Sequence, residues 1–255
     1  MDPLTRKSFQ GVMNIIRFNW HYYIIAIGLM ALLFLSTLLL PDQVRITAAV
    51  IVILIVVSLI LSLAVSWYIY DHSPLYTLNW LDRLGISPGQ HLVNINAGFD
   101  ETSPLIAAKY PGIVLNVFDF YDPLRHTEIS IERARKTYSV FPGTETISTT
   151  DVPLAANSTD FILLILSAHE IRKEAERVIF FTQLRKALTS GGRIVVVEHQ
   201  RDLPNFIAYN AGFLHFFSAK TWKQTFAGAG LSIRSIEKIT PFISTFILSK
   251  NGTAT

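Results

Sequence analysis

The sequence predicts an α/β fold, a mostly parallel seven-stranded sheet with an antiparallel last strand, preceded by a hairpin of two transmembrane helices. Residues 22–40 and 46–70 are uncharged apolar runs, each long enough to cross a hydrocarbon core of about 30 Å as a helix. Beyond residue 90, short apolar runs alternate with amphipathic segments. This alternation is typical of a parallel sheet with helices on both faces.

The composition supports this division of the chain. Half of the 255 residues are hydrophobic, and the excess lies in the first 70 residues, which leaves about 180 residues for one sizeable core. The net charge is only +3, and no dense run of Lys and Arg with interleaved aromatic residues occurs, so no nucleic-acid partner is expected. The absence of cysteine excludes disulfides, thiolate metal ligands and a cysteine nucleophile.

The two apolar runs have the flanks of a membrane hairpin. Positive charges precede the first run at Arg6, Lys7 and Arg17, whereas the loop between the runs carries one Arg and one Asp. The positive-inside rule therefore predicts an integral protein of the inner (cytoplasmic) membrane, with the N-terminus and the C-terminal domain in the cytoplasm. An aromatic belt at one membrane face is expected from Trp20, Tyr22, Tyr23, Trp67, Tyr68 and Tyr70.

Two other interpretations of the N-terminal region exist. A signal peptide is disfavoured because the first run begins late, is long and lacks a small-residue cleavage site. Two buried helices of a globular core would also be apolar, but few cores need two adjacent uncharged helices of this length. Upstream, apolar residues at helical spacing over 9–16 predict a helix that lies in the membrane interface or extends the first span. We expect residues 1–70 to be the membrane anchor, 71–90 a connector and 91–255 the α/β domain.

Turn signals divide the rest of the chain into elements. A short amphipathic helix is expected over 76–84, stopped at Gly85. The run 160–166 is continuously apolar, as in a strand that is covered on both faces. The last two strands are joined by a short link, which predicts an antiparallel hairpin at one edge. The expected strands are 92–96, 113–119, 144–149, 160–166, 193–198, 231–237 and 244–249, and the expected helices are 103–109, 128–138, 170–188, 204–217 and 219–229.

The stretch 91–103 reads as a strand, a tight turn through small residues and the start of a helix. Thr102 or Ser103 is expected to cap that helix, and Pro104 suits its first turn. Free backbone N–H groups and the positive end of the helix dipole face the turn, so the stretch predicts a cradle for a cofactor.

Ligands of such sheets bind at the carboxyl ends of the strands. Asp119 ends the second strand 21 residues after Gly98, where an acid is placed to accept hydrogen bonds from ribose hydroxyls. Ser167 and His169 follow the fourth strand and are expected to face the same crevice.

Five segments within residues 80–250 follow one another in a recognisable order. They are the turn 87–89, Ala-Gly-Phe-Asp at 97–100, Asp119, Val-Pro-Leu-Ala-Ala-Asn-Ser-Thr-Asp at 152–160, and Leu-Arg-Lys-Ala-Leu-Thr-Ser-Gly-Gly-Arg at 184–193. In this order they resemble the Rossmann-like (class I) S-adenosylmethionine-dependent methyltransferases, most closely those that act on quinones, sterols and similar small molecules. The last two segments are the most specific, being similar to that family's LPFPDNSFD lead-in and RVLKPGGR turn. The resemblance implies a Rossmann-like fold, S-adenosyl-L-methionine as cofactor and methyl transfer to a small molecule.

The resemblance also implies cofactor contacts, several of them on altered residue types. Where the family has an acidic residue in the first strand, this chain has Asn94, and where the family has two further glycines it has Asn96 and Asp100. The family's adenine-contacting Asp is replaced by Ser148, and Asp151 is the nearest acid. The polar replacements still form hydrogen bonds but make the loop bulkier, so altered cofactor binding is expected. The implied cofactor-binding residues are Asn94, Asn96, Ala97, Gly98, Asp119, Phe120, Ser148, Asp151 and Ser167.

Methyl transfer from a sulfonium requires the nucleophile to be held in line with the methyl group and water to be excluded, and a base helps when the acceptor is a hydroxyl or an ammonium. His169 is the first candidate base; the alternative is that it caps the following helix or bonds a loop. His199 is the second candidate, in a polar cluster at 198–206 that could equally be a solvated loop. The spacing matches no metal site, because His169 and Glu170 lack a second His one turn on.

The segment 206–222 is unusually aromatic for a helix on a soluble enzyme. It predicts either core packing or a hydrophobic lid over the acceptor pocket that touches the bilayer.

These features together favour a membrane-anchored methyltransferase acting on a lipophilic or membrane-associated small molecule, with the lipid bilayer as its partner. The altered loop keeps open a non-catalytic membrane scaffold or regulatory subunit. A nicotinamide oxidoreductase is disfavoured because the first strand is not followed by G-x-G-x-x-G.

Overall fold

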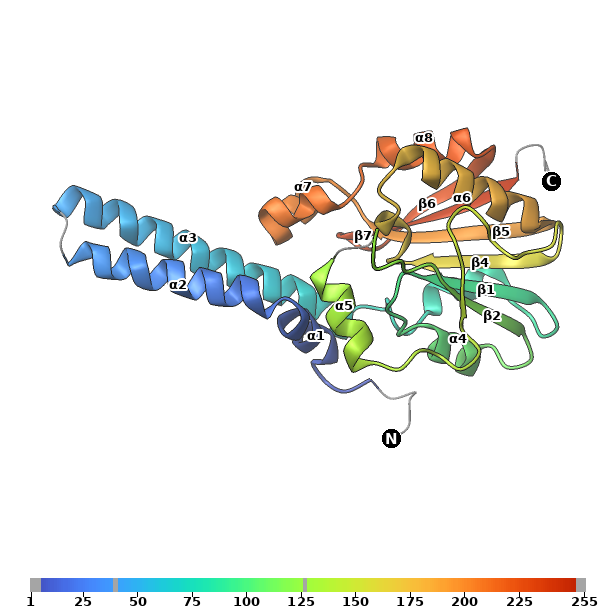
Figure 1. Cartoon of the computed structure of the whole chain (residues 1–255), viewed down its shortest axis with the longest axis horizontal. Coiled ribbons are helices and arrows are strands. Elements are labelled where there is room, and N and C mark those ends of the chain that lie inside the picture. The colour runs from blue at the N-terminus through green and yellow to red at the C-terminus, as the bar shows by residue number, and fades with distance from the viewer. Residues whose placement is uncertain (1–5, 39–40, 126–127, 251–255) are drawn as a thin grey trace.

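The computed structural model describes residues 6–38, 41–125 and 128–250, and Figure 1 shows their arrangement. The helices are α1 (Gln10–Phe18), α2 (Trp20–Thr37), α3 (Asp42–Trp67), α4 (Ser103–Lys109), α5 (Ile129–Thr137), α6 (Glu174–Ala187), α7 (Leu203–Tyr209) and α8 (Ala219–Gly228). The strands are β1 (His91–Asn96), β2 (Val114–Asp119), β3 (Glu145–Thr146), β4 (Thr159–Ile165), β5 (Leu188–His199), β6 (Leu231–Thr240) and β7 (Ile243–Lys250).

The seven strands form one sheet in the order β3-β2-β1-β4-β5-β7-β6. The neighbours from β3 to β5 are parallel, whereas β7 lies antiparallel between β5 and β6. The predicted mostly parallel seven-stranded sheet with an antiparallel last strand is therefore confirmed.

Both faces of the sheet are buried, as the apolar strands require. Along β4, Ile162 and Leu164 face one side and Phe161 and Leu163 face the other, because successive strand residues alternate. Helices α6 and α8 cover the first face (Figure 1). The second face is covered by α4, by residues 65–81 and by part of α7.

The segment expected as a connector is one of the layers that cover the sheet. Leu75, Leu78 and Leu81 are at most 1% exposed and share a cluster with strand residues. The expected helix over 76–84 is a 3-10 helix, Asn79–Leu84, which ends at Gly85 with φ +66°. The end of α3 joins the same cluster through Ile69, in the π-helical turn Tyr68–His72, so the hairpin is packed directly onto the domain.

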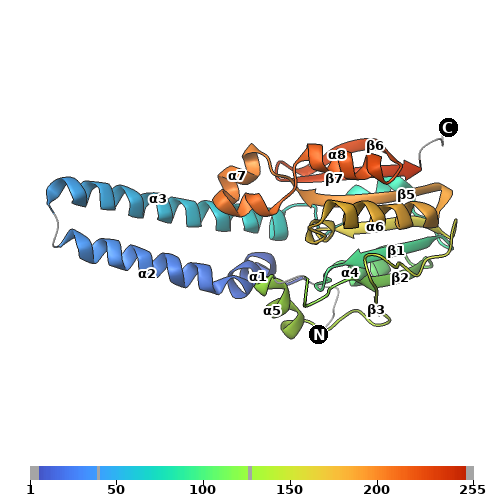
Figure 2. The same cartoon turned by 45° about the horizontal axis from the view of Figure 1, so that its top comes forward.

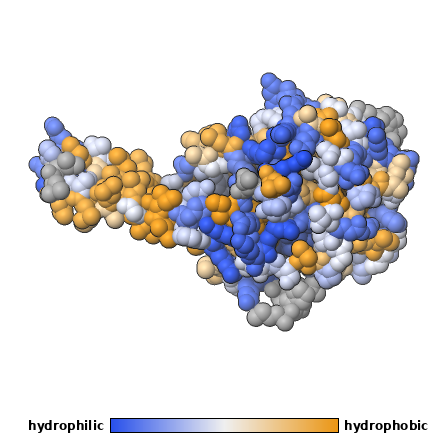
Figure 3. Space-filling model, viewed as in Figure 1, coloured by the Kyte–Doolittle hydropathy of each residue, from blue (hydrophilic) through white to orange (hydrophobic). Residues whose placement is uncertain are grey.

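Helices α2 and α3 lie side by side and extend away from the domain as an arm (Figures 1 and 2). Both are long and apolar enough to cross a membrane, by length and composition. Few of their residues are buried, 0% in Trp20–Thr37 and 11% in the most apolar part of Asp42–His72, which is unlike the helices of a globular core. The arm is accordingly hydrophobic along most of its length in Figure 3.

Helix α1 is separated from α2 at Asn19 and packs on the domain, where a helix in the interface or an extension of the span was expected. The Asp71 carboxylate accepts hydrogen bonds from two backbone N–H groups in the first turn of α1, those of Gly11 (2.7 Å) and Val12 (2.8 Å). A Cβ at Gly11 would collide with Tyr70, so only glycine permits this approach. Helix α1 is thereby fixed beside the carboxyl ends of the strands.

Two expected helices are shorter than predicted. The helix expected over 204–217 breaks at Asn210, which has φ +49°, into α7 and the 3-10 helix Asn210–His215. The helix expected over 170–188 begins at Glu174, because Ala168–Glu170 form a separate 3-10 turn. Both differences place loops, rather than long helices, at the carboxyl edge of the sheet.

Candidate active site

A cavity of about 260 Å³ lies at the carboxyl ends of β1, β4 and β5, where α/β sheets bind their ligands. Its floor is formed by the end of β1 and the loop after β4, and its walls by α1, α5 and the 3-10 helix Asn210–His215. The predicted residues that line it are Asn94, Asn96, Ala97, His169 and His199.

The turn after β1 is held by side-chain hydrogen bonds. Asn94 is 1% exposed, and its Nδ2 donates to Thr102 Oγ1 (3.0 Å) and Ser103 Oγ (2.8 Å). Thr102 occupies the N-cap position of α4, which was one of the two expectations, but its side chain forms no capping hydrogen bond. Asp100 Oδ1 instead accepts the backbone N–H groups of Thr102 and Ser103, both at 2.9 Å. The altered loop residues Asn94 and Asp100 therefore fix the turn.

Two buried polar atoms at this turn have no hydrogen-bond partner among the described residues, Asn96 Nδ2 and Asp100 Oδ2. Asn96 Oδ1 accepts from the backbone N–H of Gly98 at 3.1 Å, and Gly98 has φ +95°, a conformation that favours glycine. An unpaired donor and an unpaired acceptor on the same turn suit a zwitterionic amino-acid group, such as the one that S-adenosylmethionine carries.

Asp119 ends β2, as expected, but its carboxylate is already engaged. The side chain accepts the N–H of Tyr121 (2.8 Å) and forms an ion pair with Arg135 of α5. The Arg135 guanidinium also lies 4.6 Å from the centroid of the Tyr121 ring. Ile131 and Tyr121 fill the space above Gly98. Helix α5 thus closes the position that was expected to hold a ribose.

Asp119, Arg135 and Gly98 line a second, smaller crevice, and four other predicted contacts line neither it nor the cavity. The Phe120 side chain is in the core against Phe180, so the expected cofactor contact is wrong for this side chain. Ser167 Oγ donates to the carbonyl of Ile95 (2.8 Å) and ties β4 to β1. Ser148 and Asp151 are exposed and pair with each other in a turn that lines neither crevice.

The loop after β4 carries His169 between two carboxylates. Its Nδ1 lies 2.7 Å from Glu198 Oε2, at the end of β5, and its Nε2 lies 3.1 Å from Glu170 Oε1. The backbone N–H of His169 also donates to Glu198 Oε1 at 3.1 Å. The predicted candidate is therefore clamped on both ring nitrogens.

These neighbours set the protonation of His169. Burial alone would lower the pKa of its imidazole, but the Glu198 charge and the hydrogen bonds with Glu170 and Glu198 outweigh burial and raise the pKa to about 10. Burial likewise opposes ionisation of Glu170, yet His169 and His215 hold the pKa of that carboxyl well below its usual range. A raised pKa disfavours the expected role of His169 as a base, because a base must be unprotonated at neutral pH.

His199 has the opposite character. Its Nδ1 lies 2.9 Å from Asn205 Oδ1, its Nε2 lies 2.9 Å from the Tyr70 hydroxyl, and its ring stacks on Phe216. Burial, with the nearby His169 charge, lowers the pKa of His199 to about 4, so its imidazole is neutral at pH 7. The bond to Tyr70 connects the strand end to the base of the arm.

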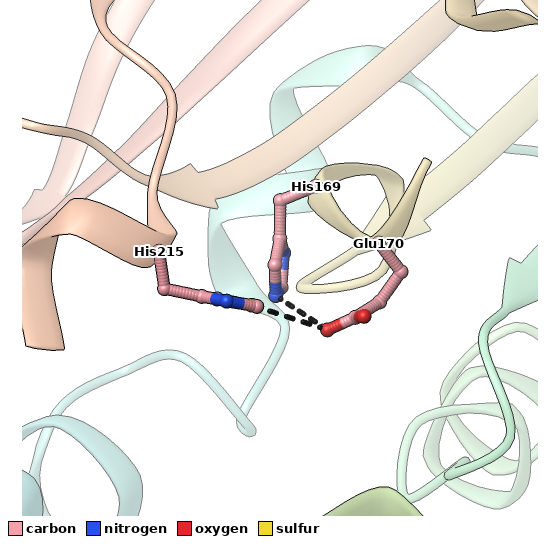
Figure 4. A group of neighbouring side chains, drawn as sticks. All are labelled: His169, Glu170 and His215. Carbon is pink, nitrogen blue, oxygen red and sulfur yellow. Dashed lines mark hydrogen bonds and ion pairs between the residues drawn. The ribbon is translucent and has the colours of Figure 1, made fainter. Parts of the chain in front are cut away.

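His215 is a site residue that sequence reasoning missed. Its Nε2 lies 3.3 Å from Glu170 Oε1, beside His169 (Figure 4). The Arg172 guanidinium joins the two loops, because it donates to the carbonyls of His169 (3.0 Å) and His215 (2.7 Å). His215 stands 45 residues after Glu170, and no local motif relates the two. The available signal in the sequence was a titratable residue within the otherwise aromatic segment 206–222.

Glu101 was also missed, and it fastens α1 over the cavity. Its carboxylate accepts from Gln10 Nε2 (3.0 Å) and the Tyr76 hydroxyl (3.0 Å) and forms an ion pair with Arg6 (2.7 Å). The Arg6 guanidinium lies 3.6 Å from the centroid of the Tyr76 ring. Asn14 and three other residues of 14–19 line the cavity, so α1 acts as its cover.

Solved structures resemble this architecture, although no family model matches the chain and no curated protein is similar to it in sequence. A SAM-dependent methyltransferase from Aquifex aeolicus superposes with a TM-score of 0.51 and 14% identity, over 69% of this chain and 90% of that one. The pyocyanin biosynthetic protein PhzM gives 0.51 and 15%, over 70% of this chain and 55% of that one. The chain has the class I methyltransferase fold. At these identities the likeness concerns the fold alone, and the chain spans about half the length of PhzM.

Proposed function

We propose that this protein is an S-adenosylmethionine-dependent methyltransferase that acts on a lipophilic or membrane-associated small molecule. One observation carries the proposal. In a class I methyltransferase fold, the cavity lies at the carboxyl ends of β1, β4 and β5, and its cover α1 leads directly into the apolar arm. A substrate that stays in the bilayer would meet such a site without leaving the membrane.

The residues at the β1 turn fit one end of the cofactor. Asn96 Nδ2 and Asp100 Oδ2 would pair with its carboxylate and ammonium groups once Ile131 and Tyr121, which cover Gly98, have moved away. Asp119 would accept hydrogen bonds from the ribose once Arg135 has moved away. The cofactor supplies an electrophilic methyl group, and its transfer requires an aligned nucleophile rather than a reactive side chain.

The chain's own residues shape the cavity and exclude water. His169 lies on the cavity wall with both ring nitrogens engaged by Glu170 and Glu198, so it would hold the wall in place rather than donate to the acceptor. His199 is neutral and its orientation is fixed by Asn205 and Tyr70. Helix α1, fastened through Glu101, keeps bulk water from the cavity.

The arm and α7 form one apolar surface, which supports membrane insertion. Helix α7 lies along α3, where Asn210 Nδ2 bonds Ser58 Oγ at 2.6 Å. Part of the aromatic segment, including Trp222, is core, as one interpretation expected. The exposed apolar side chains of α7 and the following turn, which support the lid interpretation, are Leu203, Phe206, Ile207 and Leu214. With the basic residues before α2, this surface favours an arm in the inner membrane and a cytoplasmic domain.

The test is cofactor binding by the full chain in detergent micelles, measured by calorimetry with S-adenosylmethionine. We expect saturable one-to-one binding that Asp119→Ala weakens at least tenfold and that Asp151→Ala, at an exposed acid outside the crevices, leaves unchanged. Absence of binding at millimolar cofactor would overturn the proposal.

The closed crevice favours a second candidate, a methyltransferase fold retained as a non-catalytic membrane scaffold. The Arg135–Asp119 ion pair and the packing of Ile131 above Gly98 are the specific observations. If the protein is such a scaffold, the Arg135→Ala variant would also bind no cofactor. The wild type would then co-purify stably with another membrane protein.

A further inference from the structure

We propose that His169, Glu170 and His215 form a binding site for a divalent transition-metal cation of the zinc class, with a coordination position open to the cavity. The ligands come from two loops, the turn after β4 and the end of the 3-10 helix Asn210–His215, as Figure 4 shows. Both histidines turn their Nε2 atoms towards the same carboxylate oxygen of Glu170. This site is independent of S-adenosylmethionine and goes beyond the proposed function.

The separations suit such an ion. Nε2 of His169 lies 3.1 Å, and Nε2 of His215 lies 3.3 Å, from Glu170 Oε1, and the possible ligand atoms of the three residues all lie within 4.8 Å of one another. Metal bonds of about 2.0–2.1 Å in tetrahedral geometry place neighbouring ligand atoms about 3.3 Å apart. A cation could enter with small side-chain movements.

The outer ring nitrogens provide an independent observation. Nδ1 of His169 lies 2.7 Å from Glu198 Oε2, and Nδ1 of His215 lies 3.4 Å from Glu128 Oε1. A carboxylate behind a histidine is the usual support of a metal ligand, because it fixes the tautomer that presents the Nε2 lone pair to the metal. His169 has this support from the fully buried Glu198, whereas the contact of His215 with the exposed Glu128 is longer and is an ion pair only.

The charges around the cluster also favour a cation. Glu128, Glu170 and Glu198 bring three carboxylates to two imidazoles. Glu170 and Glu198 are buried whereas Glu128 is exposed, and two neighbouring buried carboxylates need a positive charge beside them, which a divalent ion would supply.

Three protein ligands leave the ion a further position. His169, Glu170 and His215 all line the cavity, so the remaining position would face it and take water or an oxygen atom of a small molecule. Arg172 is a positioning residue here, because it bonds the backbone carbonyls of both histidines without being a ligand.

The experiment uses the full chain in detergent, stripped with a chelator, and Zn²⁺ alone as the probe. We expect one equivalent of zinc after desalting, measured by mass spectrometry, and an affinity reduced at least tenfold in His215→Ala and Glu170→Gln. The matched control is His91→Ala, an exposed histidine at the other end of β1. Near-UV circular dichroism verifies that each variant is folded. Less than half an equivalent in the wild type, or unchanged binding in folded His215→Ala, would overturn the site.

Cobalt reports the geometry and the open position. Co²⁺ in place of zinc should give visible absorption that Glu198→Gln weakens by lowering metal affinity about tenfold or more. Acetohydroxamate, a small oxygen chelator, should shift that spectrum; an unaffected spectrum would refute the open position. Neither measurement involves S-adenosylmethionine, so failure of the metal site and failure of methyl transfer are distinguishable.

Discussion

The ion pair between Arg135 and Asp119 makes a quantitative prediction about cofactor affinity. In the structure the Arg135 guanidinium pairs with the Asp119 carboxylate. The ribose of the cofactor would need the same carboxylate, so the cofactor and the Arg135 side chain compete for it. Replacing Arg135 with alanine removes the competitor. We therefore expect Arg135→Ala to bind S-adenosylmethionine more tightly than the wild type.

The magnitude follows from burial. The Asp119 side chain is 5% exposed and that of Arg135 is 32% exposed, so the pair lies between a surface and a buried salt bridge. Exposed ion pairs contribute up to about 1 kcal/mol to stability, and hydrogen bonds to charged groups contribute somewhat more. Partial solvent screening reduces the contribution of a charged hydrogen bond. Breaking this pair costs about 1 kcal/mol, which corresponds to a roughly fivefold lower dissociation constant in Arg135→Ala.

The assay is calorimetric titration of the full chain with S-adenosylmethionine. Lys136→Ala is the matched control, because Lys136 is the next residue on α5 and pairs only with exposed Glu132 among the residues that the structure describes. A melting curve accompanies each titration, since the unpaired Asp119 carboxylate should lower stability by a similar amount. Weaker or unchanged binding in Arg135→Ala would refute the competition.

Three further predictions concern the cover, the core and the arm. Asp71→Ala removes the acceptor of two α1 amides, so hydrogen exchange by mass spectrometry should rise in that turn, with a local loss of about 1–2 kcal/mol; unchanged exchange would contradict the capping role. Trp222→Ala empties a fully buried site among four aromatic rings and should cost about 3–5 kcal/mol in denaturant unfolding, and a cost below 1 kcal/mol would show that the core does not depend on it. Because the chain has no cysteine, Gln43→Cys in intact cells should react with an impermeant maleimide and Lys220→Cys only after lysis; the reverse pattern would invert the proposed topology.

Local pattern was sufficient for most of the fold. The continuous apolar run of β4 is typical of a strand covered on both faces, and the structure divides its side chains between two core clusters. The break at Asn210 was not predicted, because helical spacing continues across it and its positive φ accompanies a tertiary hydrogen bond from Asn210 Nδ2 to Ser58 Oγ of α3. The capping role of Asp100 had a local signal in the sequence, because Asp100 is an acid two residues before Thr102. The prediction considered only Thr102 and Ser103.

The residues of the candidate site also fall into those that the sequence could place and those that it could not. Asn94, Asn96, Gly98, Asp119, His169 and His199 reach the carboxyl edge because strand ends in a parallel sheet meet there, a consequence of topology that alternation reveals. Glu101, Arg135 and His215 come from segments whose contacts with the strand ends depend on how α1, α5 and the 3-10 helix pack. No sequence spacing encodes those contacts.

The sequence by itself determined the order of the elements, the apolar arm and the placement of His169 at the end of β4, since each follows from the period of apolar residues along the chain. Only the tertiary structure decided the state of that histidine. Its charge depends on Glu198, 29 residues away, and its neighbour His215 is 46 residues away. Electrostatic energies depend on distance in space, and residues this far apart in the chain approach one another only after the sheet and its covering loops have formed.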